Sequence, residues 1–480
     1  MDICKLTALQ LAEKIKKKEI STIEAVEAVF SRIEEQESLL HSFLYFKKED
    51  VLKQAEEIQK KINKQECSSL LAGVPAAFKD NLCVKGMPVT CGSKMLEHFM
   101  PSYEAFAVSA LRKAGVICLG KTNMDEFAMG STTETSAFGI TRNPLNIEHV
   151  AGGSSGGSGA AVAAEECFFA LGTDTGGSVR QPAAYCGIVG LKPTYGSVSR
   201  YGLIAYGSSL EQIGPMTKNV KDCAAVFQAI HQQDKQDFTS VAGNKTDYVN
   251  AITGNIKGKR IGVPKEFLEE GLENEIKQAI KHSLHIWEKQ GAIIEECSLS
   301  YTQYLVPVYY TIASAEASSN LERYDGVKYG FSSPQNNQKL HSWYRQNRSQ
   351  GFGSEVKRRI MLGTFVLSAG YYEDYYLQSC KVRQLIKQEF SNLLQKYDVI
   401  VSPVSPTTAP KIGESLKDPL QMYLSDLYTI PANLTGMPAI SLPCGKDSKG
   451  LPIGIQLMSN YHREDILFDF GYVLETDLKK

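Results

Sequence analysis

The stretch that decides the fold reads Ala151-Gly-Gly-Ser-Ser-Gly-Gly-Ser-Gly159, then an apolar run over 160–171, then Gly172-Thr-Asp-Thr-Gly-Gly-Ser178-Val-Arg180. Each glycine/serine cluster is joined directly to core-like sequence, whereas a flexible Gly/Ser linker has polar surroundings. The apolar run is long enough for one helix and one strand. Glycine permits unusual backbone angles and close approach by another group. The pattern therefore predicts two loops folded over one site.

The bulk composition is that of an ordinary soluble globular protein. The chain has 480 residues, of which 43% are hydrophobic and 22% charged, so one large α/β domain or two smaller ones would fit. The net charge is −1, with 52 basic and 53 acidic residues. Because the whole chain exerts no attraction on phosphate, any contact with nucleic acid requires a local basic patch.

The sequence predicts a cytoplasmic protein without a membrane segment. Lys5, Glu13 and Lys14 interrupt the early apolar runs, and no run reaches the roughly 18 apolar residues of a membrane span. The eleven cysteines include no Cys-x-x-Cys pair, which favours reduced, structural thiols. No metal site is predicted, because the His282/His285 pair lacks a third ligand.

The order of elements predicts a largely parallel or mixed sheet with helices on both faces. Thr7-x-x-Gln10 and Ser21-x-x-Glu24 resemble capping boxes, so two early helices are expected, with a third over 48–61, forming a packed cap. Strands are expected over 71–78, 116–119, 259–264, 398–402, 438–442 and 453–457, and helices over 105–114, 273–290 and from Glu464.

No composition break marks a linker, so a single domain is predicted. Residues 1–65 would form the N-terminal helices, 66–225 the catalytic core, and 226–480 the remainder of the sheet with the residues for the substrate's end. Residues 230–258 are polar and weakly periodic, which indicates a surface excursion.

Three known loop motifs compete for the first glycine cluster. A phosphate loop requires lysine after its last glycine, but Ser158 follows Gly157. A dinucleotide loop requires a strand directly before the glycines, and residues 143–149 do not read as one. The hydrolase elbow Gly-x-Ser-x-Gly matches 152–156, but a run of Gly and Ser produces this match easily, and no histidine stands in a recognisable motif.

Lys79 supplies a different base. It follows an apolar strand, and burial disfavours the ammonium form of lysine. Lowering its pKa from about 10.4 to near 7 would take roughly 4–5 kcal/mol. Neighbouring serines can then pass a proton to the neutral amine, as in Ser-Lys hydrolases. The alternative is a solvated lysine in a loop, and Lys79 alone does not decide between them.

Taken together, Lys79, the Gly-Gly-Ser-Ser-Gly-Gly-Ser-Gly cluster and Asp174-Thr-Gly-Gly-Ser178-Val-Arg-Gln-Pro182 resemble the amidase signature family. The spacing agrees as well, with 75 residues from Lys79 to Ser154 and 24 from Ser154 to Ser178. The resemblance implies a large mixed central sheet and a Ser-cis-Ser-Lys triad. Ser178 would be the nucleophile, Ser154 on a cis peptide the proton carrier, and Lys79 the general base. Ser155 would be a structural neighbour of this network or a support for it.

The second cluster also carries the expected oxyanion donors. These are the backbone amides of Thr175, Gly176, Gly177 and Ser178. Glycine lets the chain approach the substrate oxygen closely, and each donor is worth about 3–4 kcal/mol in the transition state. Asp174 and Arg180 are expected to hold the loops by charge-assisted hydrogen bonds.

Within that family, four further segments resemble the glutamine-hydrolysing A subunits of tRNA-dependent amidotransferases. They are residues 123–134, 323–330, 355–363 and 423–433. The resemblance implies a heterotrimer in which this chain releases ammonia from glutamine. The B subunit would activate the carboxylate of Glu-tRNA(Gln), and often Asp-tRNA(Asn), with ATP and Mg²⁺, and a small C subunit would wrap around this chain. The misacylated tRNA would be reached mainly through the B subunit, and no cofactor is expected in this chain.

Free glutamine carries an α-carboxylate and an α-ammonium, so its site requires one cation and one anion. Arginine binds carboxylates in a bidentate way. The resemblance assigns the two roles to Arg359 and Asp426, with Arg358 as the alternative cation if the register shifts by one. It adds Ser131 and Tyr309 as contacts to the substrate's polar ends. Without the resemblance, Arg358 and Arg359 would read as charges on a helix surface.

Two other functions remain open on the sequence. A stand-alone amidase would hydrolyse small acyl or aryl amides, although a charged pair at the substrate's end argues against it. A catalytically inactive scaffold would be a second alternative, but it gives no reason to keep Lys79, Ser154 and Ser178 together.

Overall fold

The computed structural model describes residues 2–242, 246–268, 271–334, 339–417 and 419–479. Its centre is an 11-stranded mixed sheet with the order β1-β3-β2-β6-β8-β7-β12-β13-β11-β9-β10. The strands are β1 (Phe43–Phe46), β2 (Pro75–Lys79), β3 (Ile117–Thr122), β6 (Phe169–Asp174), β7 (Val189–Lys192), β8 (Gln212–Thr217), β9 (Arg260–Pro264), β10 (Ile293–Cys297), β11 (Val399–Pro403), β12 (Ala439–Lys446) and β13 (Pro452–Ser459). β4 (Arg142–Asn143) and β5 (Asn146–Val150) form a separate pair.

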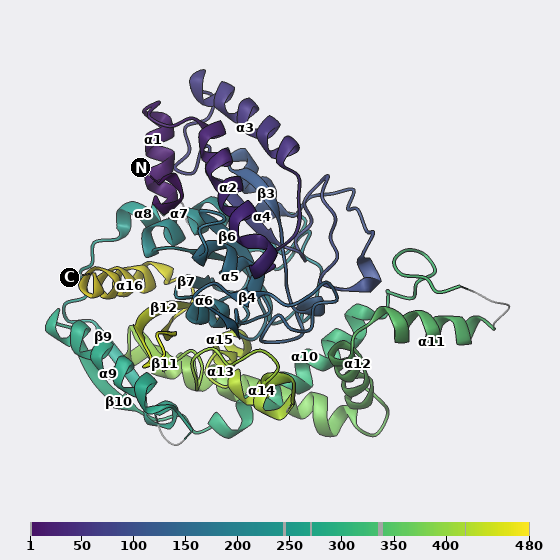
Figure 1. Cartoon of the computed structure of the whole chain (residues 1–480). Helices are drawn as coiled ribbons and strands as arrows, with labels where there is room; N and C mark the ends of the chain where they lie inside the picture. Colours follow the sequence, from purple (N-terminus) through teal and green to yellow (C-terminus); the bar gives the residue numbers. More distant parts are fainter. Residues whose placement is uncertain (1, 243–245, 269–270, 335–338, 418, 480) are drawn as a thin grey trace.

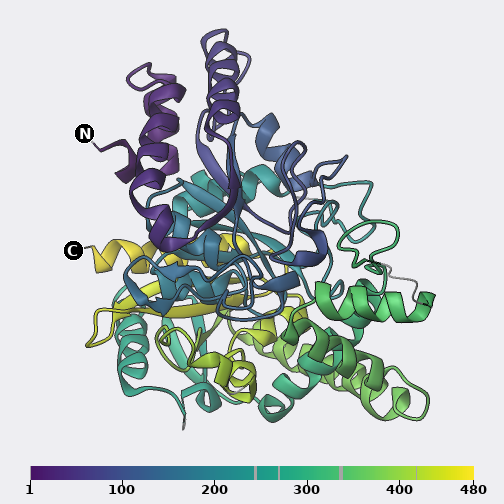
Figure 2. The same cartoon turned by 45° about the vertical axis from the view of Figure 1, so that its right-hand side comes forward.

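Helices flank the sheet on both faces, and both chain ends lie on one side of the molecule (Figures 1 and 2). They are α1 (Ala8–Lys16), α2 (Thr22–Leu40), α3 (Lys48–Asn63), α4 (Phe106–Lys113), α5 (Gly156–Ala163), α6 (Arg180–Cys186), α7 (Val220–Ile230), α8 (Tyr248–Ala251), α9 (Asn274–Lys289), α10 (Leu305–Leu321), α11 (Leu340–Gly351), α12 (Ser354–Val366), α13 (Gln378–Lys396), α14 (Pro419–Ser425), α15 (Ile430–Thr435) and α16 (Glu464–Leu478). None of the helices described here has the length and apolarity to span a membrane.

The predicted fold class is confirmed, because parallel and antiparallel strand pairs occur together in one sheet. β2 runs parallel to both β3 and β6, and β9 runs parallel to β10 and β11. The remaining neighbours are antiparallel, including β6 with β8 and β12 with β13. Both early capping boxes are present at Thr7 and Ser21.

Three sequence predictions need correction. Residues 143–149 were not expected to contain a strand, but β5 forms directly before the first glycine cluster, where it pairs with β4. The strand expected over 71–78 begins only at Pro75, because residues 71–74 form a turn in which the Val74 amide donates to the Leu71 carbonyl. Residues 230–258 are not a simple surface excursion. They include α8, and the side chains of Tyr248 and Ile256 are buried in the main hydrophobic core. Within this stretch, residues 243–245 lie outside the described part.

The sheet explains why the two glycine loops meet. β2 and β6 are parallel neighbours, so their carboxyl ends lie at the same edge of the sheet. β2 ends at Lys79, and β6 ends at Asp174, directly before the second glycine cluster. The first cluster leads into α5, which packs on β6 and β2. Residues far apart in the sequence are therefore delivered to one edge.

Candidate active site

Lys79 is a fully buried lysine at the end of β2. Its Nζ donates to Ser154 Oγ at 2.7 Å and to the Thr173 carbonyl at 3.3 Å. Burial lowers the pKa of Lys79 to about 7, although the negative charges of Asp125 and Asp174 oppose this shift. A substantial fraction of the amine is therefore neutral near pH 7 and able to accept a proton.

Ser154 lies in the first glycine loop, and its peptide bond with Gly153 is cis. The next residue, Ser155, ties this loop to the second one. The Ser155 amide donates to the Ser178 carbonyl at 3.1 Å, and Ser155 Oγ donates to the Thr173 carbonyl at 3.2 Å. The two glycine loops thus converge as the sequence predicted.

Ser178 differs from its two partners in accessibility. Its exposed fraction is 8%, whereas Lys79 and Ser154 are fully buried. A nucleophile must be reached by substrate, while a lysine base keeps its lowered pKa only away from water. The arrangement suits an accessible Ser178 backed by a buried proton acceptor.

A buried ion pair shapes the second loop. Arg180 donates from Nε to Asp174 Oδ2 at 2.9 Å and from Nη2 to Asp174 Oδ1 at 2.8 Å. Asp174 also accepts the amides of Gly177 at 2.9 Å and Val179 at 3.2 Å. Burial acts to raise the pKa of Asp174, but the Arg180 guanidinium holds it well below its usual range. The carboxylate therefore orders the loop around Ser178.

The structure narrows the set of oxyanion donors. The Gly177 amide donates its hydrogen bond to Asp174, so it is not free to bind a substrate oxygen. Within the described residues, the amides of Thr175, Gly176 and Ser178 donate no hydrogen bond to the protein. Gly177 is still required as glycine, since its φ is +131° and a Cβ there would clash with Thr429 Oγ1.

Arg359 is a buried cation on α12. Its Nε donates to Glu355 Oε1 at 2.8 Å, and its Nη1 donates to Tyr206 Oη at 2.6 Å. Arg358 instead has a side chain that is 47% exposed, and it pairs with Glu355 from the solvent side. Of the two adjacent arginines, Arg359 is the one that faces the interior.

Three aromatic rings surround the Arg359 guanidinium. They belong to Tyr206, Tyr310 and Tyr423, at 5.7, 5.1 and 5.5 Å from its central carbon. Their faces stabilise the buried positive charge, and they restrict the orientation of the guanidinium. Arg359 is therefore held rigidly by the protein.

Asp426 is the buried anion nearby. It accepts hydrogen bonds from Ser131 Oγ at 3.0 and 3.3 Å and from Tyr310 Oη at 2.7 Å. Burial raises the pKa of Asp426 to about 6, although the hydrogen bonds and the charge of Arg359 act in the other direction. The structure thus brings the predicted Ser131 and Asp426 together.

Two side chains connect this charged end to the glycine loops. Gln181 donates to the Ser131 carbonyl at 2.9 Å and accepts the Gly153 amide at 2.9 Å. Thr429 Oγ1 donates to the Gly176 carbonyl at 2.5 Å and to the Asp426 carbonyl at 3.1 Å. The charged end and the two loops therefore belong to one site.

Tyr309 lies against the second loop. A Cβ added to Gly176 would clash with the Tyr309 Oη, so the hydroxyl reaches the backbone beside Ser178. Burial raises the pKa of Tyr309 well above its ordinary value, which keeps the phenol neutral. Its hydroxyl also hydrogen-bonds with Tyr206, so Tyr309 connects the second loop to the surroundings of Arg359.

Sequence reasoning missed the residues that hold Arg359 and the loops. They are Tyr206, Glu355, Tyr310, Tyr423, Gln181 and Thr429. Glu355 had a usable signal, because it stands four residues before Arg359 on one helix. The others carry no local pattern, since separate segments of the chain contribute them.

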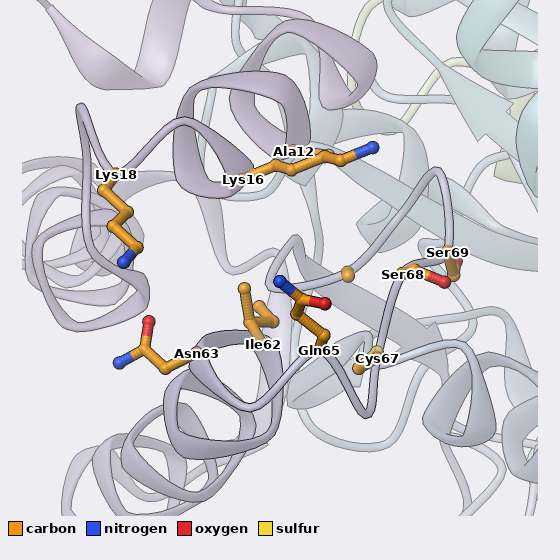
Figure 3. A pocket seen from close by; sticks show the side chains of 10 residues that line it. Ala12, Lys16, Lys18, Ile62, Asn63, Gln65, Cys67, Ser68 and Ser69 are labelled. Atoms are coloured by element: carbon orange, nitrogen blue, oxygen red, sulfur yellow. The ribbon is translucent and has the colours of Figure 1, made fainter.

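A cavity of about 470 Å³ elsewhere on the molecule is a different feature. It lies between α1 and α3 and is lined by residues including Lys16, Lys18, Asn63 and Cys67 (Figure 3). None of its lining residues belongs to the site at the sheet edge. In the parts of the chain that are described, no group of three or more His, Cys, Asp or Glu side chains is arranged to hold a metal ion.

Comparison with known proteins identifies the family. Residues 24–468 match the family described as "Amidase". The A subunit of glutamyl-tRNA(Gln) amidotransferase from Lachnospira eligens is 56% identical over 475 residues, which cover 99% of this chain and 98% of that protein. The protein of the same name from Clostridium botulinum is 50% identical over 478 residues, covering 100% and 98%.

Solved structures show the same relationship. The crystal structure of the A subunit of glutamyl-tRNA(Gln) amidotransferase from Thermotoga maritima has a TM-score of 0.81 and 40% identity, covering 99% of this chain and 95% of that one. The peptide amidase from Stenotrophomonas maltophilia has a TM-score of 0.83 and 27% identity, covering 99% and 97%. The chain belongs to the amidase family.

Proposed function

We propose that this chain is the glutamine-hydrolysing subunit of a tRNA-dependent amidotransferase. The observation that carries the proposal is the buried pair of opposite charges, Arg359 and Asp426, joined to the site of Lys79, Ser154 and Ser178. Free glutamine carries both a carboxylate and an ammonium, and this pair offers each of them a partner. The relatives at 50–56% identity are named as A subunits of glutamyl-tRNA(Gln) amidotransferase, which supports the same function.

The acylation step uses the three residues in turn. Ser178 Oγ attacks the side-chain amide carbon of glutamine and gives its proton to Ser154 Oγ, which passes its own proton to neutral Lys79. The amides of Thr175 and Gly176 stabilise the oxyanion of the tetrahedral intermediate. When the C–N bond breaks, the proton returns from Lys79 through Ser154 to the leaving nitrogen. The products are ammonia and a glutamyl ester of Ser178.

Deacylation runs the same relay with water. A water molecule gives a proton through Ser154 to Lys79 and attacks the ester carbonyl. Collapse of this second intermediate returns the proton to Ser178 Oγ and releases glutamate. Each cycle therefore consumes one glutamine and one water and restores the neutral lysine.

The ammonia would be used by partner subunits. In this proposal the B subunit, with ATP and Mg²⁺, activates the carboxylate of Glu-tRNA(Gln), and of Asp-tRNA(Asn) where that tRNA is formed. A cytoplasmic heterotrimer is completed by a small C subunit. The relatives' designation as A subunits supports an assembly. Exposed apolar side chains on α12 and in the segment after it, among them Met361, Phe365, Tyr371 and Tyr375, also favour a bound partner.

Changing Arg359 to alanine tests the charged pair. Because a hydrogen-bonded charge pair contributes about 1.5–3 kcal/mol, we expect the KM for glutamine to rise roughly 10- to 100-fold, with a smaller change in kcat. Ammonia release from glutamine is the measurement. Arg358→Ala is the matched control, because that side chain is 47% exposed, and it should leave KM nearly unchanged. An unchanged KM in Arg359→Ala would contradict the proposal.

The pH dependence of hydrolysis should report Lys79 and Asp426 separately. Lys79 must be neutral to accept a proton, so kcat/KM should rise with pH through its pKa of about 7. We call this rise the acid limb. Asp426 binds the ammonium of glutamine only as a carboxylate, so the KM for glutamine should increase as the pH falls below the Asp426 pKa of about 6. Steady-state rates between about pH 5.5 and 8.5 test this, and a flat profile would exclude the lysine as base.

The stand-alone amidase remains the second candidate, and the charged pair argues against it. A neutral acyl or aryl amide carries no charge that Arg359 or Asp426 can bind, so it lacks the charge-assisted hydrogen bonds that free glutamine would add to their existing protein contacts. Comparing turnover of glutamine with that of small neutral amides decides the question. Preference for the neutral amides, with the partners of the assembly present, would favour the alternative.

A further inference from the structure

Asp125 and Glu126 are adjacent, buried carboxylates that the proposed reaction does not use. Asp125 organises the loop that carries Ser131. Its Oδ2 accepts the amides of Thr132 at 3.2 Å and Thr133 at 2.9 Å, and its Oδ1 accepts the Thr135 amide at 3.3 Å and hydroxyl at 2.8 Å. Four donors on one carboxylate fix the position of the loop beside Asp426.

The same aspartate also contacts the catalytic loop. The Asp125 amide donates to the Ser154 carbonyl at 3.2 Å. Its carboxylate packs beneath Gly153, where an added Cβ would clash with Oδ2. The negative charges of Asp125, Asp174 and Glu211 act to raise the pKa of Lys79, against the effect of burial. The nearby Cys91 thiol stays neutral, because burial raises its pKa well above the ordinary value. Asp125 therefore adjoins both the proton relay and the loop at the charged end.

Glu126 contacts the start of α12, the helix that carries Arg359. Its Oε2 accepts the Gly353 amide at 2.8 Å, and its Oε1 accepts Ser93 Oγ at 2.5 Å. Gly353 is the residue before α12, and this helix start has no side-chain cap of its own. A helix N-terminus requires acceptors for its free amides, and Glu126, which lies outside α12, supplies one of them. Arg359 follows on the same helix.

We infer that Asp125 and Glu126 are positioning residues that fix the distance between the proton relay and the two charges that hold the substrate. The inference rests on the proposed glutaminase function of this site. Asp125 sets the loop of Ser131 and the electrostatic surroundings of Lys79, while Glu126 sets the helix of Arg359. Because the two carboxylates are consecutive in the chain, one short segment aligns the loop of Ser131 and the helix of Arg359 with the nucleophile. Small misplacements of such groups cost large factors in rate.

Asp125→Asn separates this role from a merely structural one. The amide keeps the size of the side chain but removes the charge and puts an NH₂ group where a carboxylate oxygen accepts N–H donors. We expect kcat to fall at least tenfold and the acid limb to move to lower pH, by roughly half a pH unit or more, because a negative charge near lysine favours its protonated form. If Asp125 only ordered the loop of Ser131, its replacement would lower kcat without shifting the acid limb.

Thr135→Val is the matched variant, and it also covers the case in which Asp125→Asn does not fold. It removes one hydrogen bond to Asp125 Oδ1, together with the bond from the Glu126 amide, and leaves every charge in place. The expected result is a smaller loss of kcat with the acid limb unmoved. A limb displaced equally in both variants would overturn the electrostatic part of the inference.

Glu126→Ala and Glu126→Gln test the link to Arg359. Alanine removes the acceptor for the Gly353 amide, so we expect KM for glutamine to rise roughly tenfold while the acid limb stays in place. Glutamine retains a carbonyl oxygen that can accept this amide, so Glu126→Gln should recover most of the affinity. An unchanged KM in Glu126→Ala would overturn the role of Glu126.

A probe that does not depend on glutamine separates this inference from the proposed function. Phenylmethanesulfonyl fluoride sulfonylates an activated serine, with loss of fluoride and transfer of the serine proton to the base. The pH dependence of Ser178 modification in the wild-type chain should follow Lys79, with its midpoint lowered in Asp125→Asn. If the midpoint is lowered in Asp125→Asn but the wild-type chain does not hydrolyse glutamine, the proposed glutaminase function is refuted and the role of Asp125 is retained. An unshifted midpoint would refute that role.

Discussion

Replacing Ser178 by alanine is expected to abolish ammonia release from glutamine, with kcat falling by roughly 10⁴-fold or more. Ser178 is the accessible hydroxyl of the three, and its backbone lies beside the free amides of Thr175 and Gly176. Without this oxygen no acyl-enzyme forms, and neither Ser154 nor Lys79 can replace it, because both are fully buried. Residual activity within tenfold of wild type would reject Ser178 as the nucleophile.

Two controls keep this result specific. Ser155→Ala removes a neighbouring hydroxyl whose hydrogen bonds go to the Thr173 backbone, so the expected loss is about tenfold or less. Thermal unfolding of Ser178→Ala should match the wild type closely, since the substitution removes only one oxygen from a partly accessible position. A large drop in unfolding temperature would point to a folding defect instead.

Local signals carried much of the fold. Apolar runs predicted strands β3, β9, β11, β12 and β13, and paired Ser/Thr and Glu/Gln residues predicted the first two helix starts. These local signals failed where contacts with the rest of the fold determine the secondary structure. Much of α10 is buried, so it shows no polar face, and residues 71–74 read as strand but turn before β2. Burial by the rest of the fold overrides propensity at such places.

The site likewise has features that local sequence patterns predict and features that only the fold reveals. The two glycine loops are local patterns, and their sequence was enough to expect that they meet. The lysine at the strand end was added to them only by the resemblance to the amidase signature family. The aromatic surroundings of Arg359 were not predictable, because Tyr206, Tyr310 and Tyr423 come from three distant segments. The Gly177 amide shows a further limit. Sequence identifies a possible donor, but only the fold reveals that Asp174 already occupies it.

Replacing Lys79 by methionine is expected to lower kcat by roughly 10³- to 10⁴-fold, because the reaction loses its proton acceptor. Methionine is similar in length and keeps the buried space filled, so the loss reports chemistry. The acid limb should disappear from whatever activity remains. Turnover close to wild type would show that another group accepts the serine proton. Ammonia release measured across pH is the test.

The same variant carries an opposite expectation for stability. The pKa of Lys79 is lower in the folded state, about 7, than its ordinary value of 10.5, so the folded protein binds fewer protons than the unfolded chain between these values. Wild-type stability should therefore rise with pH over this window, and below it the buried amine costs about 5 kcal/mol.

Methionine removes that cost but leaves Ser154 Oγ without its donor, which costs about 1–3 kcal/mol, while the Thr173 carbonyl still accepts the Ser155 hydroxyl. The free energy of unfolding of Lys79→Met should thus equal or exceed that of the wild type near pH 7, and the difference should shift in favour of the wild type toward pH 10. A difference that does not change with pH would mean that the lysine has an ordinary pKa in the folded protein. A base that destabilises the fold and accelerates the reaction is what a site selected for catalysis requires.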